Sequence, residues 1–458
     1  MVQIVIILAY FFMIAIFGKF AKRASSEQEY EGHNLGLLMC IAIGAGEWLG
    51  GTSISGVSEY GFLYGISGAT YTLANALGIC FLALFLARFY RRLNVSTVPE
   101  IIGMYVGTNA RMVASAILWM IMMLVGVSQM VAIGAIGETL LHLDVKISII
   151  LFGSFVIIYT LIGGMNVIGN TNIVHMVFMY VGVLAVLIFE LSNIGGITTL
   201  VDNLGDKYFS ISTIGYEKVF SWITASILGA CTAQAGIQPI LKSKNEKVAV
   251  QASFLIAICV APFGIIIALL GIISRYLFPE IVDGKLALYT LILSLNPILS
   301  GMVMASLIAA ILSTAAPILI SCGTLLKRDM YDVIAKKKRK DLGIARILTA
   351  ISGIICILLG VTFGADAQIL DFIYFAYSLR GSLFIIIVFS IISKNMSEKT
   401  AIISMIITTF VSLLWVINKQ LSGYYLIPHV TETYVAVFTT FFGCAIGSLI
   451  HNLKYKEI

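Results

Sequence analysis

Residues 44–53 read GAGEWLGGTS, so four glycines and a carboxylate fall within ten residues. The stretch lies inside an apolar run, residues 36–56, and roughly 20 apolar residues are enough for a helix to cross a bilayer. Glycine is a poor helix former, and a charge at the centre of a membrane is costly. Because an unbroken helix satisfies its own backbone in lipid, we predict a functional reason for a break near Glu47.

A second apolar run, residues 217–241, has the same character. It carries Gly229, Gly236 and Pro239, with polar side chains among them. These runs are the second and seventh apolar segments of the chain, which gives them opposite orientations in the membrane. Interrupted helices in two oppositely oriented halves are typical of inverted-repeat transporters. Close helix packing through small residues explains the glycines alone equally well.

The composition indicates a membrane protein throughout. Of 458 residues, 59% are hydrophobic and 11% are charged, and the mean hydropathy is +1.01. A soluble domain carries about 25% charged residues. We predict an all-α polytopic membrane protein with about 13 transmembrane helices, over residues 2–18, 36–56, 66–89, 110–136, 146–165, 172–193, 217–241, 249–276, 298–326, 342–363, 369–393, 400–418 and 430–450.

The basic residues orient these segments. If the first span is retained with its N-terminus outside, 22 Lys and Arg residues fall on the cytoplasmic side and six outside, with Arg380 alone at mid-span. The first run lacks the preceding basic residue of a cleaved signal peptide. We therefore predict a multi-pass protein of the cell (plasma or inner) membrane with a cytoplasmic C-terminus. The basic run 336–340 is interpreted as an anchor at anionic lipid, not a nucleic-acid site.

The ninth segment carries hydroxyl groups at helical spacing. It reads AAILSTAAP over 309–317, so that Ala310, Ser313 and Thr314 share one face. A backbone carbonyl and two hydroxyls are neutral oxygens suited to a small hard cation, and unwound carbonyls of the second segment can complete the shell. The alternative is that both hydroxyls bond back to their own helix.

Several motifs, in this order along the chain, resemble the sodium:solute symporter family. They are GGTSISG at 50–56, YG at 64–65, RR at 91–92 with TVPE at 97–100, YTLIGGM at 159–165, QPILKSK at 238–244, and AAILST at 309–314 closing with DMY at 329–331. The resemblance implies a leucine-transporter-type fold of five plus five helices. Its repeats would be residues 36–193 and 217–394, joined by an extracellular loop at 194–216. An extra helix and linker at 1–35 and two helices at 395–458 would lie outside the repeat.

The resemblance also implies a function and an ion site. The function is sodium-coupled symport of a small polar organic solute, such as an amino acid, carboxylate, vitamin or sugar-like compound, by alternating access. The coupling ion is Na⁺, with no organic cofactor. The partners are the solute and the bilayer, without nucleic acid, and a monomer suffices. The implied ligands of Na⁺ are the carbonyls of Gly46, Leu49 and Ala310 and the hydroxyls of Ser313 and Thr314.

Departures from the family pattern leave alternatives open. Asn172 stands where the family often has an acidic residue, Ala316 replaces the acid after S-T-A, and Pro239 replaces an arginine. Glu47 and Glu59 are carboxyl groups that can carry a proton, so proton-coupled symport on the same fold is the main alternative. A membrane-embedded enzyme or a sensor is a further one, although the sequence contains no clustered nucleophile, base or metal motif.

The solute is expected at mid-membrane between the broken helices. Candidate residues for binding it are Glu47, Trp48, Thr52, Ser53, Thr72, Asn75, Gln129, Ser226 and Arg380. The polar ones can equally form hydrogen bonds between helices. Two hypotheses concern the charged ones: Glu47 and Arg380 pair with each other or bind opposite charges of a zwitterion, or Arg380 alone holds a carboxylate in a bidentate fork. Arg380 bonded to backbone carbonyls is the structural alternative.

Overall fold

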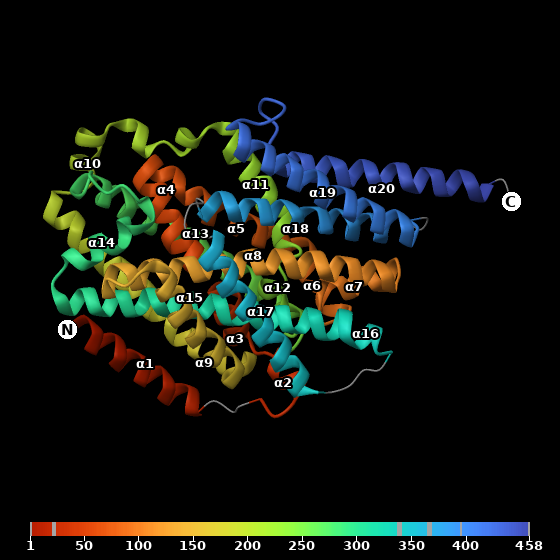
Figure 1. Cartoon of the computed structure of the whole chain (residues 1–458), viewed down its shortest axis with the longest axis horizontal. Helices are drawn as coiled ribbons and strands as arrows, with labels where there is room; N and C mark the ends of the chain where they lie inside the picture. The colour runs from red at the N-terminus through yellow and green to blue at the C-terminus, as the bar shows by residue number, and fades with distance from the viewer. Residues whose placement is uncertain (1, 21–23, 337–340, 364–368, 394–395, 457–458) are drawn as a thin grey trace.

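Apolar segments separated by short polar loops form a bundle of helices in the computed structural model (Figure 1). The structure describes the whole chain except residues 1, 21–23, 337–340, 364–368, 394–395 and 457–458. Most of the predicted lipid anchor at 336–340 lies outside the described residues. The same holds for the basic residues Lys22, Arg23 and Lys394 of the predicted cytoplasmic loops.

The helices divide between two halves of the chain. The first half contains α1 (Val2–Phe20), α2 (Glu27–Glu31), α3 (Leu37–Trp48), η1 (Thr52–Gly56), α4 (Val57–Tyr64), η2 (Gly65–Ala69), α5 (Thr70–Phe81), η3 (Leu82–Leu86), α6 (Ala87–Arg92), α7 (Val98–Tyr105), α8 (Thr108–Leu141), α9 (Val145–Ile194) and α10 (Ile197–Leu204). The second half contains η4 (Asp206–Phe209), η5 (Ile211–Ile214), α11 (Tyr216–Ala230), α12 (Gln234–Leu241), α13 (Glu246–Leu277), η6 (Gly284–Leu286), α14 (Ala287–Ser294), α15 (Pro297–Leu325), η7 (Leu326–Tyr331), α16 (Asp332–Ile334), α17 (Leu342–Phe363), α18 (Ile369–Ile392), α19 (Glu398–Ser422) and α20 (Glu432–Lys456).

Ten helical stretches among the described residues are long and apolar enough to cross a membrane, so the count of 13 spans stays a prediction. The structure differs from the predicted spans in α9, which runs through the predicted segments 146–165 and 172–193 without an intervening loop. Its backbone leaves the helical range only at Gly164, where φ is 69°. A Cβ there would lie 3.1 Å from Ala24 and from Tyr30, so glycine suits both the kink and the close contact.

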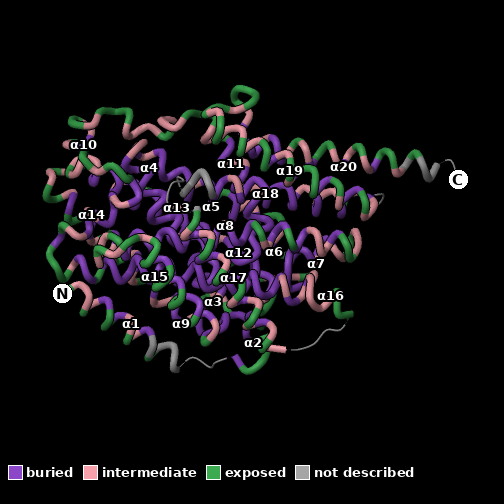
Figure 2. Tube along the Cα trace, in the orientation of Figure 1, coloured by how far each residue is buried: buried purple, intermediate pink, exposed green. Residues whose placement is uncertain are grey.

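α15 lies at the centre of the bundle. Its residues from 303 to 325 are all buried, and it packs against α1, α8, α9 and α17. In Figure 2 this burial is seen as a purple band through the middle of the molecule, with exposed residues on the outer helices. α19 and α20 pair with each other beside α18, and the two chain ends lie at opposite ends of the bundle (Figure 1).

Both predicted interruptions are present in the structure. α3 ends at Trp48, and after a non-helical turn the chain continues as the π-helix η1 from Thr52. α11 ends at Ala230 and α12 begins at Gln234, with a turn over 231–233. The second break therefore lies between the glycines that indicated it, not at them. Gly229 and Gly236 are helical, and their small size serves close contacts described below.

Candidate ion and solute site

The break after α3 faces α15. Thr314 of α15 donates a hydrogen bond from Oγ1 to the carbonyl of Gly46, and it lies 3.2 Å from the carbonyl of Ala310. Ser313 donates to the same Ala310 carbonyl at 2.8 Å. All four residues are buried. Four of the five predicted ion ligands therefore gather at one place. Ser313 and Thr314 also bond back to their own helix, which is what the alternative interpretation of these two hydroxyls predicts.

Leu49, the fifth predicted ligand, lies in the turn beside this cluster. Its φ of −105° and ψ of 27° end the regular helix, and its N–H donates to the Ala45 carbonyl at 3.0 Å. The next residue, Gly50, contacts α15 so closely that a Cβ on it would overlap Oγ1 of Thr314. A glycine is therefore required for the two helices to approach at this point.

Asn172 of α9 also borders the cluster, although it is not among the ligands predicted from the sequence. Its amide nitrogen donates to the Ser313 carbonyl at 3.1 Å and to the Ala42 carbonyl at 3.3 Å. Its Oδ1 is buried and has no hydrogen-bond partner among the described residues. The signal that could have found it is its place in the family pattern, where an acidic residue is common. It adds a neutral oxygen to the surroundings of the cluster.

Three of the solute candidates hold the unwound segment in place. Oε1 of Gln129, on α8, accepts a hydrogen bond from the Gly51 N–H at 2.7 Å, and its Nε2 donates to Oγ1 of Thr52 at 3.2 Å. The Ser53 hydroxyl donates to the Trp48 carbonyl. Such bonds satisfy backbone groups that a break in a helix leaves unpaired. Gln129, Thr52 and Ser53 are thus engaged with the break itself.

The candidates on α5 and α11 lie in the interior of the bundle. Thr72 lies against α13, where a Cβ on Gly264 would overlap its hydroxyl. Gly78 of α5 lies against the Ser226 carbonyl, so α5 and α11 approach closely there. Thr72, Asn75 and Ser226 are completely buried.

Glu47 and Arg380, the charged candidates, are brought together. Arg380 on α18 is completely buried, and its Nη2 lies 3.9 Å from Oε1 of Glu47. Its guanidinium lies 4.8 Å from the centre of the Tyr377 ring, against which the Trp48 ring packs edge-on at 6.0 Å. A Cβ on Gly236 of α12 would lie 3.0 Å from Oε2 of Glu47 and 3.1 Å from Nε1 of Trp48. The two broken helices therefore meet at this charge pair.

An aromatic column extends from the charge pair toward the start of α11. The Tyr377 and Tyr71 hydroxyls are 2.9 Å apart, and Tyr374 packs against the Tyr71 ring. Tyr374 in turn stacks on Trp222 at 4.2 Å between ring centres, and Trp222 contacts Tyr60. Sequence reasoning missed these residues, because aromatic side chains in apolar segments are indistinguishable from ordinary core residues without their partners.

Ion pairs link several helix ends on another side of the bundle. Thr97 forms a capping box with Glu100 at the start of α7, so the TVPE motif is a helix N-terminus. Arg111 of α8 lies 3.0 Å from Glu100 and donates from Nε to Asp329 of the DMY motif at 2.7 Å. Thr97 donates to the same Asp329 carboxylate at 3.0 Å. Two motifs of the family pattern thus form one network.

A second set of pairs continues this network onto α2. Arg328 lies 2.7 Å from Glu31, and Lys327 lies 2.9 Å from Asp332. Burial raises the pKa of the Glu31 carboxyl, although Arg328 beside it acts in the opposite direction. We call these residues the ion-pair layer: Glu27, Glu31, Thr97, Glu100, Arg111, Lys327, Arg328, Asp329 and Asp332.

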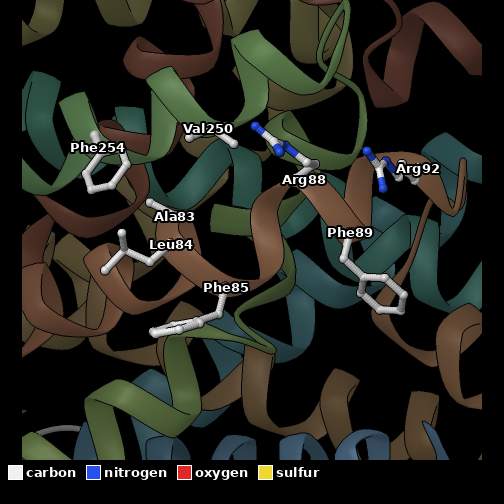
Figure 3. A pocket seen from close by; sticks show the side chains of 8 residues that line it. All are labelled: Ala83, Leu84, Phe85, Arg88, Phe89, Arg92, Val250 and Phe254. Carbon is white, nitrogen blue, oxygen red and sulfur yellow. The ribbon is translucent and has the colours of Figure 1, made fainter.

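A pocket of about 330 Å³ lies elsewhere, between η3, α6 and α13 (Figure 3). Arg88 and Arg92 project into it beside apolar side chains such as Phe85. Both arginines lie near Glu246, at 3.8 and 2.8 Å. This pocket contains none of the predicted ion or solute residues and is separate from the site described above.

Comparison with protein families identifies the kind of protein that has this arrangement. A model of the sodium:solute symporter family matches residues 32–408. This chain belongs to the sodium:solute symporter family. The symporter is 23% identical to the osmoregulated proline transporter OpuE of Bacillus subtilis over 456 residues, which covers 93% of this chain and 92% of that one.

Two further proteins resemble this symporter. The high affinity choline transporter 1 of Homo sapiens is 23% identical over 415 residues, covering 84% of this chain and 71% of that one. A solved Na⁺-coupled sialic acid symporter, in a substrate-bound outward-open state, superposes with a TM-score of 0.81 at 15% identity and covers 98% of both chains.

These findings confirm the predicted family, the helical membrane fold of leucine-transporter type, and a transporter in place of an enzyme. They also confirm a membrane location. The orientation of the termini, the repeat boundaries and the individual site residues stay predictions.

Proposed function

We propose that this symporter couples inward movement of Na⁺ to uptake of a small polar organic solute by alternating access. The observation that carries the proposal is the contact of the Thr314 hydroxyl with the Gly46 carbonyl. It joins the central helix α15 to the last turns of α3, directly before the unwound segment. An ion held there would tie the break to α15.

The groups at this contact suit sodium. They are neutral oxygens: the hydroxyls of Ser313 and Thr314 and the carbonyls of Gly46 and Ala310, with the Leu49 carbonyl in the adjacent turn. Unwound carbonyls coordinate Na⁺ in transporters with broken helices. The unpartnered Oδ1 of Asn172 is a further neutral oxygen next to them. No group in this set needs to titrate, so a sodium ion fits it better than a proton.

Sodium at this place would also act on the solute site. Glu47 and Trp48 follow Gly46 directly, so an ion that fixes the Gly46 carbonyl fixes their positions beside Arg380. A ligand shifts a conformational equilibrium only through its differential affinity for the two states. Inward movement of one charge gains about 2.3 kcal/mol per 100 mV of inside-negative potential, which biases accumulation more than tenfold for each ion coupled.

The proposal is tested by measuring uptake of labelled small polar organic solutes into proteoliposomes, with and without a sodium gradient. Thr314→Ala removes one ligand oxygen. With the contact between this oxygen and Na⁺ taken as comparable to a hydrogen bond to a charged group, about 1.5–3 kcal/mol, the apparent sodium affinity should fall about tenfold or more. Thr324→Ala is the matched control, because Thr324 is a buried threonine of the same helix whose hydroxyl, among the described residues, donates to the Ile320 carbonyl of its own helix alone. It should leave sodium dependence unchanged.

Two outcomes would overturn the proposal. Equal sodium dependence of both variants would remove Thr314 from the ion site. Uptake driven by a proton gradient, and indifferent to sodium, would favour the proton-coupled alternative that Glu47 and Glu59 suggest.

A further inference from the structure

The charge pair at the meeting point of the broken helices is incompletely satisfied. Its 3.9 Å separation exceeds the roughly 2.7–2.9 Å of a charge-assisted hydrogen bond. Nη2 of Arg380 donates instead to Sδ of Met122 at 3.4 Å, and a thioether is a weak acceptor. Within the described part of the chain, Oε2 of Glu47 and both Nε and Nη1 of Arg380 have no hydrogen-bond partner.

We infer that the solute is a small zwitterion, whose cationic group lies against Glu47 and the face of Trp48 and whose carboxylate is bound by Arg380. This inference rests on the proposed transport function. A buried charge without partners is strongly unfavourable, so a ligand that supplies partners gains much of its affinity here. A neutral solute would leave both charges poorly satisfied, and a solute with one charge would satisfy one and bring a net charge into the membrane.

The aromatic surroundings fit this assignment. The face of a Trp or Tyr ring attracts a cation, and Arg380 already lies over the Tyr377 ring. Trp48 is adjacent to Glu47 in the chain and packs edge-on against Tyr377. A cationic group near Glu47 would therefore have both a carboxylate and an aromatic face within reach, while the Arg380 guanidinium stays over the Tyr377 ring.

The tight packing restricts the solute to a small one. Gly236 approaches both Glu47 and Trp48, and a Cβ on Gly229 would lie 3.1 Å from the Tyr377 carbonyl. These two glycines flank the break between α11 and α12. A large solute would need this whole region to open, whereas a small one needs only the Glu47–Arg380 separation to widen.

Asn75 is assigned to the rest of the solute. It lies one helical turn after Tyr71, whose hydroxyl is 2.9 Å from that of Tyr377, the ring over which Arg380 lies. Its Oδ1 and Nδ2 are buried and find no hydrogen-bond partner among the residues that the structure describes. Buried polar atoms are normally satisfied, so an unpaired amide here indicates a donor and an acceptor held for a ligand.

A competition experiment in proteoliposomes tests the inference. Compounds of similar size are compared by how far each raises the thermal stability of the symporter and by how strongly each inhibits uptake of a labelled solute. The three classes are neutral amino acids and betaines, the corresponding carboxylates without the amine, and uncharged polyols. Zwitterions should bind best. In Glu47→Gln their affinity should fall about tenfold or more relative to wild type, while the amine-free carboxylates should gain relative to them. Glu190→Gln, a carboxylate change near the end of α9, should leave this selectivity unchanged.

Arg380 is tested by a conservative change. Arg380→Lys keeps the charge but cannot form a bidentate fork, so it should weaken binding of zwitterions and amine-free carboxylates by similar factors. Normal transport by Arg380→Lys would overturn the bidentate role. Stronger binding of polyols or single-charge compounds than of zwitterions in the wild type would overturn the inference as a whole.

Sodium binding without solute separates this inference from the proposed function. A sodium-induced rise in thermal stability of the purified symporter, lost in Thr314→Ala, reports the ion site alone. If that rise is present and zwitterions fail to bind, the solute class is wrong while sodium coupling stands. If the rise is absent, the proposed function itself fails.

Discussion

Two of the regions that bury charged side chains in this symporter, the ion-pair layer and the meeting point of the broken helices, differ in their surroundings. In the ion-pair layer, Arg111 reaches two carboxylates, Asp329 accepts from both Arg111 and Thr97, and Arg328 lies 2.7 Å from Glu31. At the meeting point of the broken helices, Glu47 and Arg380 are 3.9 Å apart and keep unpaired atoms within the described structure. Both regions join helices that are distant in sequence.

The difference indicates two roles for buried charge. In the ion-pair layer each charge has a close partner of opposite sign, so the groups hold helix ends together, although Oδ2 of Asp329 has no hydrogen-bond partner in the described structure. At the broken helices the protein supplies only part of the partners, which is unfavourable unless something else supplies the rest. Stability is therefore expected to depend on the first region, and ligand binding on the second.

The largest expected effect comes from breaking the ion-pair layer. Asp329→Ala leaves Arg111 with Glu100 and the Arg328 carbonyl among the described residues, and it deprives Thr97 of an acceptor. Breaking a buried ion pair from one side costs about 3–5 kcal/mol, and the remaining Glu100 contact places this change near the lower value. Thermal denaturation of the purified protein should show a melting point several degrees lower. Asp202→Ala, at an exposed position on α10, is the control, and an equal melting point for both variants would refute the structural role of the layer.

The opposite result is expected at the broken helices. Replacing both members of the pair, as Glu47→Met with Arg380→Met, removes two incompletely satisfied charges. Replacing a buried pair by apolar residues is often neutral or stabilising by about 1–4 kcal/mol. The double variant should therefore melt at or above the wild-type temperature and fail to transport. A strongly lowered melting point would show that the pair serves the fold and not the solute.

This comparison also shows what the sequence could predict. The apolar runs and the glycines at 44–53 predicted a membrane bundle with a break near Glu47, because hydropathy and backbone propensity are local properties. The spacing of Ser313 and Thr314 placed two hydroxyls on one face for the same reason. The contact of Glu47 with Arg380 could be raised as a hypothesis, since an intramembrane charge needs a partner.

Other features depend on contacts between distant segments and were not predictable from a single sequence. Gln129 was a solute candidate, but its bond to the Gly51 N–H ties it to the break. The aromatic column is visible only in three dimensions, because in the sequence its members Tyr71, Tyr377 and Trp222 look like ordinary core residues. The second break falls at 231–233, where no residue has a positive φ, so the neighbouring glycines did not mark its position.

The smallest expected effect refines the description of the ion-pair layer. The Thr97 hydroxyl both caps α7, accepting from the Glu100 N–H at 3.3 Å, and donates to Asp329 at 3.0 Å. Loss of an N-cap costs about 1 kcal/mol, so Thr97→Ala should lower the melting point less than Asp329→Ala. Thr97→Ser keeps both hydrogen bonds and should restore stability to nearly the wild-type value. If Thr97→Ala and Asp329→Ala are combined, the two losses should be less than additive, because both remove the same Thr97–Asp329 bond. Full additivity would mean that the cap and the ion pair act independently, and that the layer is a set of separate contacts in place of one network.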